Sequence, residues 1–240
     1  MRMRWLEPLF VHFHVPRASV EARVPDGLVL DADGRDALIS LVALGAVGPA
    51  PAFVTATPLA RLLRYPQLAV QTYVNGPHGP GRLLLELRVE RRWAFAARAL
   101  GLPCRRDPEL RYEVDASAVA LRAGGIAVRG LPAPEASGRE VTDELERRTL
   151  GRDLLYGQAP RGSVYALSVR HQPWRLRAVE LAPDSAIAVP GLTPVGELAP
   201  TRALAAHVAA SVDVRFESIA LLEPAGRVGR AALSLVQSAL

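Results

Sequence analysis

The chain has 240 residues, of which 50% are hydrophobic and 22% are charged, and its formal net charge is +5. This length and composition are typical of a globular protein with a sizeable aliphatic core. All 29 basic residues are arginines, because the chain contains no lysine, and this absence excludes Schiff-base catalysis by a side chain, pyridoxal phosphate chemistry included.

The N-terminal part of the chain predicts two strands. In LFVHFHV the residues alternate, with Leu9, Val11, Phe13 and Val15 on one face and Phe10, His12 and His14 on the other. An Asp-Gly turn at residues 33–34 then precedes a buried strand. The uncharged stretch 37–60 is long enough to cross a bilayer, but its glycine and proline residues favour a strand that runs into a loop. We therefore expect no membrane segment.

The middle of the chain predicts a hairpin and a helix. QLAVQTYV and RLLLELRVE are the arms of the hairpin, joined by NGPHGPG, and Leu83, Leu85, Leu87 and Val89 are expected to share one face. Apolar residues at positions 93, 96, 97 and 100 then have the spacing of a helix face. Gly101 and Pro103 end that helix, so Cys104, the only cysteine, follows directly after it.

The second half of the chain predicts further strands between short helices. Two strands surround Gly124 and Gly125, and Ser137 with Glu140 has the capping-box spacing that begins a helix. In the strand after residue 163, alternation puts His171 on the same side as Tyr165 and Val169, with a break at Pro173. TRALAAHVAA (201–210) predicts a helix, and a strand follows at 212–217.

Many strands and two or three short helices indicate one β-rich domain over residues 1–240. No internal repeat or linker divides it. A sheet of this kind hides its edges by curling or closing, and we expect an antiparallel β-barrel. A barrel of this size can enclose a ligand cavity.

The order of several segments resembles that of a known family. These segments are RWLEPLFVHFHV (4–15), YPQLAVQTYV (65–74) with its Gly-rich turn, the helix end GLP (101–103) and VRHQPW (169–174). Together they resemble the YqjF-like domain of unknown function, which belongs to the acetoacetate decarboxylase-like superfamily. The resemblance covers most of the chain and implies an antiparallel β-barrel with a largely apolar internal pocket.

The enzymes of that superfamily carry a Gly-aromatic-Pro-Lys-Lys run whose first lysine forms the Schiff base. In GLPCRR the resemblance places Cys104 at the reactive lysine and Arg105 at its neighbour. It places Gln67 at the active-site glutamate that follows a tyrosine. Because no lysine exists anywhere in the chain, decarboxylation through an imine is chemically unavailable in any register.

Cys104 is a candidate nucleophile if a base lies nearby, but the preceding helix presents its C-terminus, which disfavours a thiolate. The alternative is a small side chain in a pocket wall. Arg98 and Arg105 flank the same turn and are suited to hold a substrate carboxylate. A surface ion pair is the alternative for both.

His12 and His14 have the i, i+2 spacing that presents two imidazoles to a metal, with His171 or Glu86 as a third ligand. Because no spacing marks a third ligand, we predict no metal site. His171 and Trp174 are suited to be the polar anchor and the flat wall of a pocket. The predicted pocket residues are His171, Trp174, Cys104, Arg105, Arg98, Gln67, Glu86 and Tyr73.

These observations favour a non-decarboxylating member of the superfamily that binds a small apolar or carboxylate-bearing molecule in its barrel. Two alternatives stay open: a lyase or hydrolase that uses histidine and arginine on a carbonyl compound, and a structural or assembly protein whose tail, 226–240, docks on a neighbour. A homo-oligomer also stays open. We expect no cofactor, since dinucleotide, phosphate-loop, zinc and nucleophile-elbow motifs are absent.

The arginines occur as short pairs among carboxylates, with no basic run and no interleaved aromatic residues. We therefore expect no nucleic-acid partner. The single cysteine cannot form an internal disulfide, and the first 15 residues lack the apolar run of a signal peptide. A cytoplasmic protein is the expectation.

Overall fold

The computed structural model describes residues 2–48, 64–90, 102–134, 138–158, 162–189, 192 and 203–222. These residues form a mainly β structure with two short helices, α1 (Arg17–Glu21) and α4 (Glu144–Leu150). The strands are β1 (Arg2–Pro16), β2 (Val29–Leu30), β3 (Ala32–Asp33), β4 (Asp36–Val47), β5 (Arg64–Gly76), β6 (Gly79–Val89), β7 (Cys104–Arg106), β8 (Arg111–Val114), β9 (Val119–Ala123), β10 (Ile126–Pro132), β11 (Leu154–Gln158), β12 (Val164–His171), β13 (Leu176–Leu181), β14 (Ala186–Ile187), β15 (Ala203–Ala209) and β16 (Val212–Leu222).

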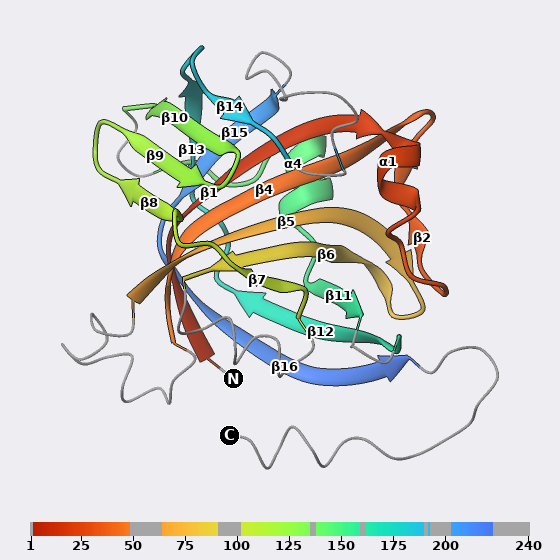
Figure 1. The fold of residues 1–240 in the computed structure, drawn as a ribbon. Helices are drawn as coiled ribbons and strands as arrows, with labels where there is room; N and C mark the ends of the chain where they lie inside the picture. Colours follow the sequence, from red (N-terminus) through yellow and green to blue (C-terminus); the bar gives the residue numbers. More distant parts are fainter. Residues whose placement is uncertain are drawn as a thin grey trace.

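Seven of these strands close into a barrel (Figure 1). The order is β4-β5-β6-β11-β12-β16-β1, and the long pairing of β1 with β4 completes the ring. The predicted β-barrel is therefore confirmed. Its strands are not all antiparallel, because β6 runs parallel to β11, and β7 is also parallel to β6.

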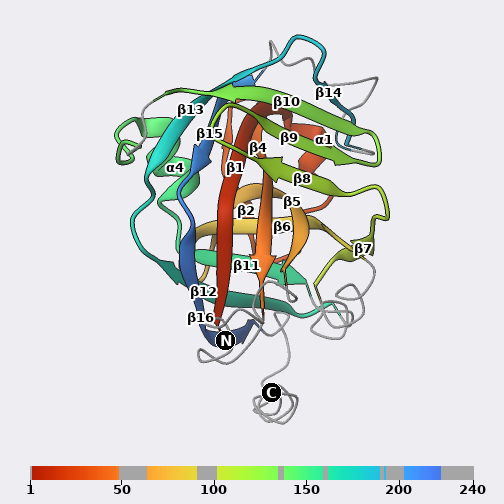
Figure 2. The ribbon, with the colours of Figure 1, turned by 90° about the vertical axis from the view of Figure 1, so that its left-hand side faces the viewer.

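A second, antiparallel sheet of β13, β10, β9 and β8 covers the outside of the barrel. In Figure 2 its strands β8, β9 and β10 cross β1 and β4 at a steep angle. Leu9, Val11 and Phe13 of β1 pack with Leu121 and Val128 of the second sheet in one buried cluster. These odd-numbered residues of β1 thus face outward, as their alternation predicts, and Phe10 and His12 face into the barrel.

The inner face of the barrel has its own apolar cluster, which we call the inner core. It contains residues from β1, β4, β5, β6, β7, β12 and β16, and Leu150 of α4 also packs in it. Its members include Trp5, Phe10, Val42, Tyr65, Ala69, Leu84, Leu87, Cys104, Val169, Trp174 and Val214. The interior is therefore partly filled by side chains and by one helix.

A β-bulge in β6 corrects the predicted alternation of the hairpin. The register of β5 with β6 shifts between Val70 and Gln71, which leaves Leu85 without a direct partner. Leu84 and Leu87 consequently both lie in the inner core, whereas Leu83 packs in a separate cluster. The predicted common face of Leu83, Leu85, Leu87 and Val89 is wrong, because a strand that contains a bulge inverts its faces at that point.

Two helix predictions also need correction. Residues 203–209 form strand β15 between β1 and β13 and not a helix, because two flanking strands satisfy the backbone of this alanine-rich segment on both sides. Helix α4 begins at a capping box of Asp143 and Glu146, later than the predicted start. Ser137, the predicted helix at 93–100 and the tail lie outside the described residues.

Candidate functional site in the barrel interior

The barrel interior contains buried polar atoms that have no hydrogen-bond partner within the described part of the chain. Each belongs to a side chain on an inward-facing strand position. They include Trp5 Nε1, His12 Nε2, Arg82 Nε, Tyr165 Oη, His171 Nε2 and His207 Nδ1. A buried polar group without a partner costs about 1–3 kcal/mol. Such a concentration is typical of an interior that accommodates water or a polar ligand.

His12, Ser40 and Tyr73 form a buried hydrogen-bonded chain. His12 of β1 lies directly opposite Ser40 of β4, and the distance from His12 Nδ1 to Ser40 Oγ is 2.6 Å. Ser40 Oγ is also 2.6 Å from Tyr73 Oη. Burial, together with the nearby His207, lowers the pKa of His12 to about 3 although Glu146 opposes the change. His12 is therefore neutral near pH 7.

Among the interior side chains, Arg82 has the largest desolvation penalty, because its charge is buried without an ion pair. It lies opposite Tyr73 in the sheet and is only 3% exposed. None of the described residues accepts a hydrogen bond from it or pairs with it, and Asp153 attracts it only from beyond ion-pair distance. Burial lowers the pKa of Arg82, but arginine keeps its proton in proteins.

The neighbouring Arg152, unlike Arg82, has its hydrogen-bond donors and its charge paired. Its guanidinium lies 5.2 Å from the centre of the Tyr73 ring. It donates to the carbonyl oxygens of Val74 and Gly81 and forms an ion pair with Asp31. Arg152 thus has a full set of partners, whereas the buried Nε of Arg82 has none among the described residues.

His171 is on the inner face, as its alternation with Tyr165 and Val169 predicts, and Trp174 lies against it. Their ring centres are 4.1 Å apart, and Trp174 also contacts Phe10 at 5.1 Å. His171 Nδ1 donates to the Gln172 carbonyl oxygen at 2.7 Å, so its buried Nε2 carries the lone pair. Burial lowers the pKa of His171, and the charge of Arg82 contributes to that shift. The charge of Arg82 therefore acts on His171 electrostatically.

A third interior histidine, His207, lies beside Glu146 of helix α4. His207 of β15 lies opposite Phe10 of β1, and His207 Nε2 is 3.1 Å from Oε1 of Glu146. Glu146 is fully buried. It also accepts hydrogen bonds from Arg139 and from the Thr142 amide, which hold its pKa below the usual range against the effect of burial.

The structure places the other predicted pocket residues as two separate groups. Gln67 lies opposite Leu44 and Val89, and Cys104 is in the inner core beside Leu87. Glu86 and Arg105 form an ion pair of 3.3 Å on the opposite face of β6, where Glu86 also accepts from Arg88. Arg98 lies outside the described residues.

The sequence reasoning missed Arg82, Ser40, Glu146 and His207. A lone arginine at the start of the apolar run RLLLELRVE was an available signal. His14 is exposed whereas His12 is buried, and no group of three metal-binding side chains occurs among the described residues. Among these residues, no helix has the length and apolar character required to cross a membrane.

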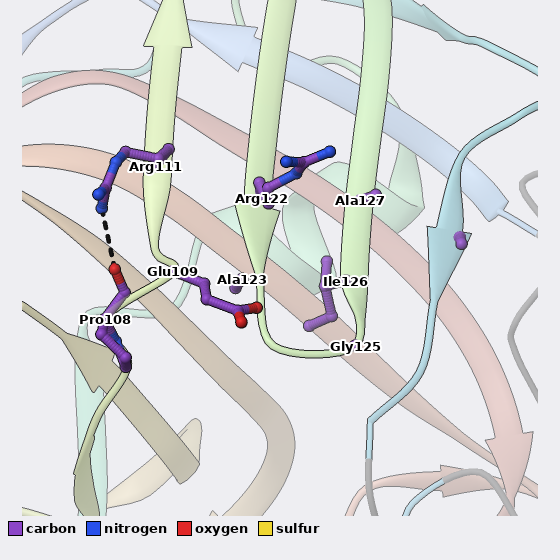
Figure 3. Close-up of a pocket in the computed structure, with 9 residues that line it drawn as sticks. Pro108, Glu109, Arg111, Arg122, Ala123, Gly125, Ile126 and Ala127 are labelled. Carbon is purple, nitrogen blue, oxygen red and sulfur yellow. Dashed lines mark hydrogen bonds between the residues drawn. The ribbon is translucent and has the colours of Figure 1, made fainter.

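Two surface hollows are lined by other residues. One, of about 560 Å³, lies on the outer sheet between the β8, β9 and β10 strands (Figure 3). Arg111 in this hollow donates a hydrogen bond of 3.1 Å to the Pro108 carbonyl oxygen. The other charged residues that line the hollow, Glu109 and Arg122, are exposed. The other, of about 350 Å³, includes Arg4, Gln172 and Arg175. Neither is lined by a predicted pocket residue.

Comparisons with known proteins agree with this architecture. The family model DUF2071, described as "Uncharacterized conserved protein (COG2071)", matches residues 2–213. No curated protein matches the chain significantly.

Among solved structures, the enduracididine biosynthesis enzyme MppR complexed with pyruvate is similar, with 14% identity, a TM-score of 0.62 and coverage of 92% of this chain and 90% of that one. An acetoacetate decarboxylase-like enzyme from Sphingomonas wittichii RW1 has 16% identity, a TM-score of 0.57 and 92% coverage of both chains. Acetoacetate decarboxylase from Legionella pneumophila has 9% identity, a TM-score of 0.58 and covers 93% and 88%. These similarities confirm the fold.

Proposed function

The chain belongs to the DUF2071 family of uncharacterized conserved proteins and has the acetoacetate decarboxylase-like fold, and from this premise we propose that its barrel binds a small carboxylate-bearing molecule without imine chemistry. The absence of lysine removes the imine route. What remains is a closed barrel whose inner face carries hydrogen-bonding groups and one unpaired positive charge.

Buried Arg82 is the observation that carries this proposal. A guanidinium removed from water requires an anion and several acceptors to offset its desolvation. Arg82 has neither within the described part of the chain. A carboxylate fits the planar fork of arginine in a bidentate geometry, and a ligand of that class would supply both the charge and the acceptors.

The aromatic wall of Trp174, Phe10 and Trp5 supports an apolar portion in the same ligand. Trp5 and Trp174 are stacked at 6.4 Å, and Phe10 meets Trp174 edge-on. Sites for small molecules are commonly apolar with a few placed polar groups that fix orientation. The predicted roles of His171 and Trp174 as anchor and wall are part of this proposal.

Calorimetry with a series of straight-chain carboxylates, from acetate to pentanoate, tests the proposal. We expect binding of the carboxylates and none of the matching primary amides, and we expect Arg82→Gln to weaken carboxylate binding at least tenfold. Arg170→Gln is the matched control, because Arg170 is an exposed arginine in an ion pair with Glu217. Equal binding by wild type and Arg82→Gln would refute the role of Arg82.

A proton-transfer enzyme is the second candidate function. Its supporting observation is the unpartnered Nε2 lone pair of His171, whose pKa is lowered by burial and by the charge of Arg82. Such a group is suited to remove a proton next to a carbonyl whose carboxylate is held by arginine. Proton NMR in D₂O would detect loss of the pyruvate methyl signal with wild type and its persistence with His171→Gln. Unchanged pyruvate with wild type would argue against this activity.

A further inference from the structure

His12 and His207 are two buried histidines on the paired strands β1 and β15. The unpartnered ring nitrogen of one is a hydrogen-bond donor, and that of the other is an acceptor. They face the same interior: His207 lies opposite Phe10, and His12 lies opposite Ala205, two residues away along β15. Side chains in this diagonal relation are within reach of each other through a small group. Each has one ring nitrogen beside a polar group, Ser40 Oγ for His12 and Glu146 Oε1 for His207, and one buried without a partner.

The proton on His12 can be assigned by counting hydrogens along the chain with Ser40 and Tyr73. If Tyr73 donates to Ser40 and Ser40 donates to His12 Nδ1, both hydroxyl hydrogens are used and the imidazole proton is on Nε2. In the reverse direction the Tyr73 hydrogen needs another acceptor. Within the described part of the chain, Ser40 Oγ is the one atom that lies in hydrogen-bond geometry to Tyr73 Oη.

The reverse direction therefore leaves two buried groups unpaired, and the forward direction leaves one. Since each unpaired group carries a penalty, the forward direction is favoured. His12 is then a neutral imidazole with an unused Nε2–H donor. This use of donor and acceptor capacity follows from the inventory of hydroxyl and imidazole groups.

The proton on His207 follows from its carboxylate partner. Glu146 Oε1 lies 3.1 Å from His207 Nε2, and because a carboxylate can only accept, the hydrogen of the neutral ring is favoured on Nε2. Burial lowers the pKa of His207, although Glu146 opposes the shift, and the ring is neutral near pH 7. Its unpartnered Nδ1 therefore presents a lone pair.

We propose that His12 and His207 together recognise a hydroxyl group of the molecule bound in the barrel. The hydroxyl oxygen accepts from His12 Nε2–H, and the hydroxyl hydrogen is donated to His207 Nδ1. A keto oxygen can satisfy only the first of these groups, and a methylene satisfies neither. The preferred ligand class is thus a hydroxycarboxylate, and this inference rests on the proposed carboxylate-binding function.

Matched pairs of carboxylates test the proposal by calorimetry: lactate with propionate, 3-hydroxybutyrate with butyrate, and 5-hydroxypentanoate with pentanoate. We expect at least one hydroxy compound to bind about tenfold more tightly than its partner, which corresponds to one recovered hydrogen-bond pair. Failure of every carboxylate to bind would contradict the proposed function. Binding of the carboxylates with no hydroxyl preference in any pair would overturn only this inference.

Two substitutions separate recognition from folding. His12→Asn keeps a group at the Nδ1 position for Ser40 but removes the Nε2 donor. His207→Gln keeps a donor for Glu146 but removes the Nδ1 lone pair. We expect each to abolish the hydroxyl preference and to leave the affinity for the plain carboxylate within about twofold. A retained preference in both variants would contradict the proposal.

Nitrogen-15 NMR of the wild-type histidines gives a readout that needs no ligand. In both His12 and His207, Nε2 is expected to carry hydrogen and Nδ1 to be unprotonated at pH 7.5. Resonances assigned through the two variants would identify each ring. A protonated Nδ1 on either histidine would remove the required pair of one donor and one acceptor, and the proposal with it.

Discussion

Cys104 has the most reactive functional group in the chain, yet its surroundings are those of a packing residue. Its side chain is buried in the inner core near Leu87, and its thiol makes a long hydrogen bond of 3.9 Å to the Arg105 carbonyl oxygen. A buried free cysteine behaves as a small apolar side chain and is chemically inert. At the position that the family resemblance gives to a catalytic lysine, this chain therefore has a buried residue of an apolar cluster.

Replacing Cys104 by alanine tests this interpretation. We expect Cys104→Ala to lower the free energy of unfolding by about 1 kcal/mol, because a buried sulfur is lost, and to leave carboxylate affinity within about twofold. Urea denaturation and calorimetry measure the two effects. Complete loss of binding, or rapid reaction of the native thiol with a disulfide reagent, would instead point to a functional cysteine.

Side chains such as Arg82 and Ser40 show why the site was harder to predict than the fold. Sequence alternation gives the face of a residue but not the identity of its cross-strand partner. The register of β1, β4 and β5 places His12, Ser40 and Gln71 directly opposite one another, and no local pattern contains this information. The inward position of His171 was predictable because it follows the alternation of Tyr165 and Val169.

At the scale of elements, strands that alternate regularly were predicted correctly, and segments that tertiary pairing controls were not. Strand β1 has a continuous alternation from Leu9 to Val15 and lies as expected. Strand β15 is rich in alanine, a strong helix former, but it is extended because β1 and β13 pair with it on both edges. The β6 bulge is likewise a product of pairing, since its sequence alternates without interruption.

The junction between the barrel and the outer sheet depends on a buried arginine of β6, Arg88. Its Nη1 donates to the Gly124 carbonyl oxygen at 2.6 Å and to Asp107 at 3.4 Å, and its Nε donates to Glu86 at 2.8 Å. Gly124 belongs to the turn between β9 and β10, and its amide also donates to Asp107. One side chain thus connects the barrel wall to the covering sheet.

Replacing Arg88 should therefore lower the stability of the fold strongly. We expect Arg88→Met to lower the free energy of unfolding by about 3 kcal/mol or more, because Asp107 is left as a buried charge without its cation. The double variant Arg88→Met, Asp107→Asn should lose less than the sum of the single changes. Urea denaturation measures each value. Arg129→Gln, which removes an exposed ion pair with Asp184, is the control and should change stability by less than about 1 kcal/mol. Strict additivity would contradict the coupling.

For the whole molecule, the barrel fold was predictable from the sequence, but the set of side chains that meet in its interior was not. The number of alternating segments and the family resemblance both indicated a closed sheet, and they required no knowledge of register. The contents depend on which residues of distant segments meet inside, including Glu146 from α4 and His207 from a segment predicted as helix. The result is an interior in which three histidines, His12, His171 and His207, are held neutral by burial.

This interior makes the stability of the whole molecule depend on pH. The pKa of His12 is lowered to about 3 in the folded state, whereas an unfolded histidine has a pKa of about 6.5. Below about pH 6.5 the unfolded chain therefore binds a proton that the folded protein does not, and stability falls as the pH decreases toward 3. Burial also lowers the pKa of His171 and His207, which act in the same direction.

The slope of the free energy of unfolding against pH shows how many histidines contribute. His12 alone should remove about 1.4 kcal/mol of stability for each pH unit below 6.5, or about 2 kcal/mol at pH 5, and the other two should make the wild-type slope steeper. Urea denaturation between pH 5 and 8 measures it. His12→Asn should reduce the slope by nearly one proton well below pH 6.5 and leave it unchanged near pH 8, whatever its own stability, because the difference in bound protons and not the contact energy sets the slope. Equal stability at pH 5 and pH 7.5 would show that the interior admits charged imidazoles, and the neutral donor and acceptor pair of His12 and His207 would then have no basis.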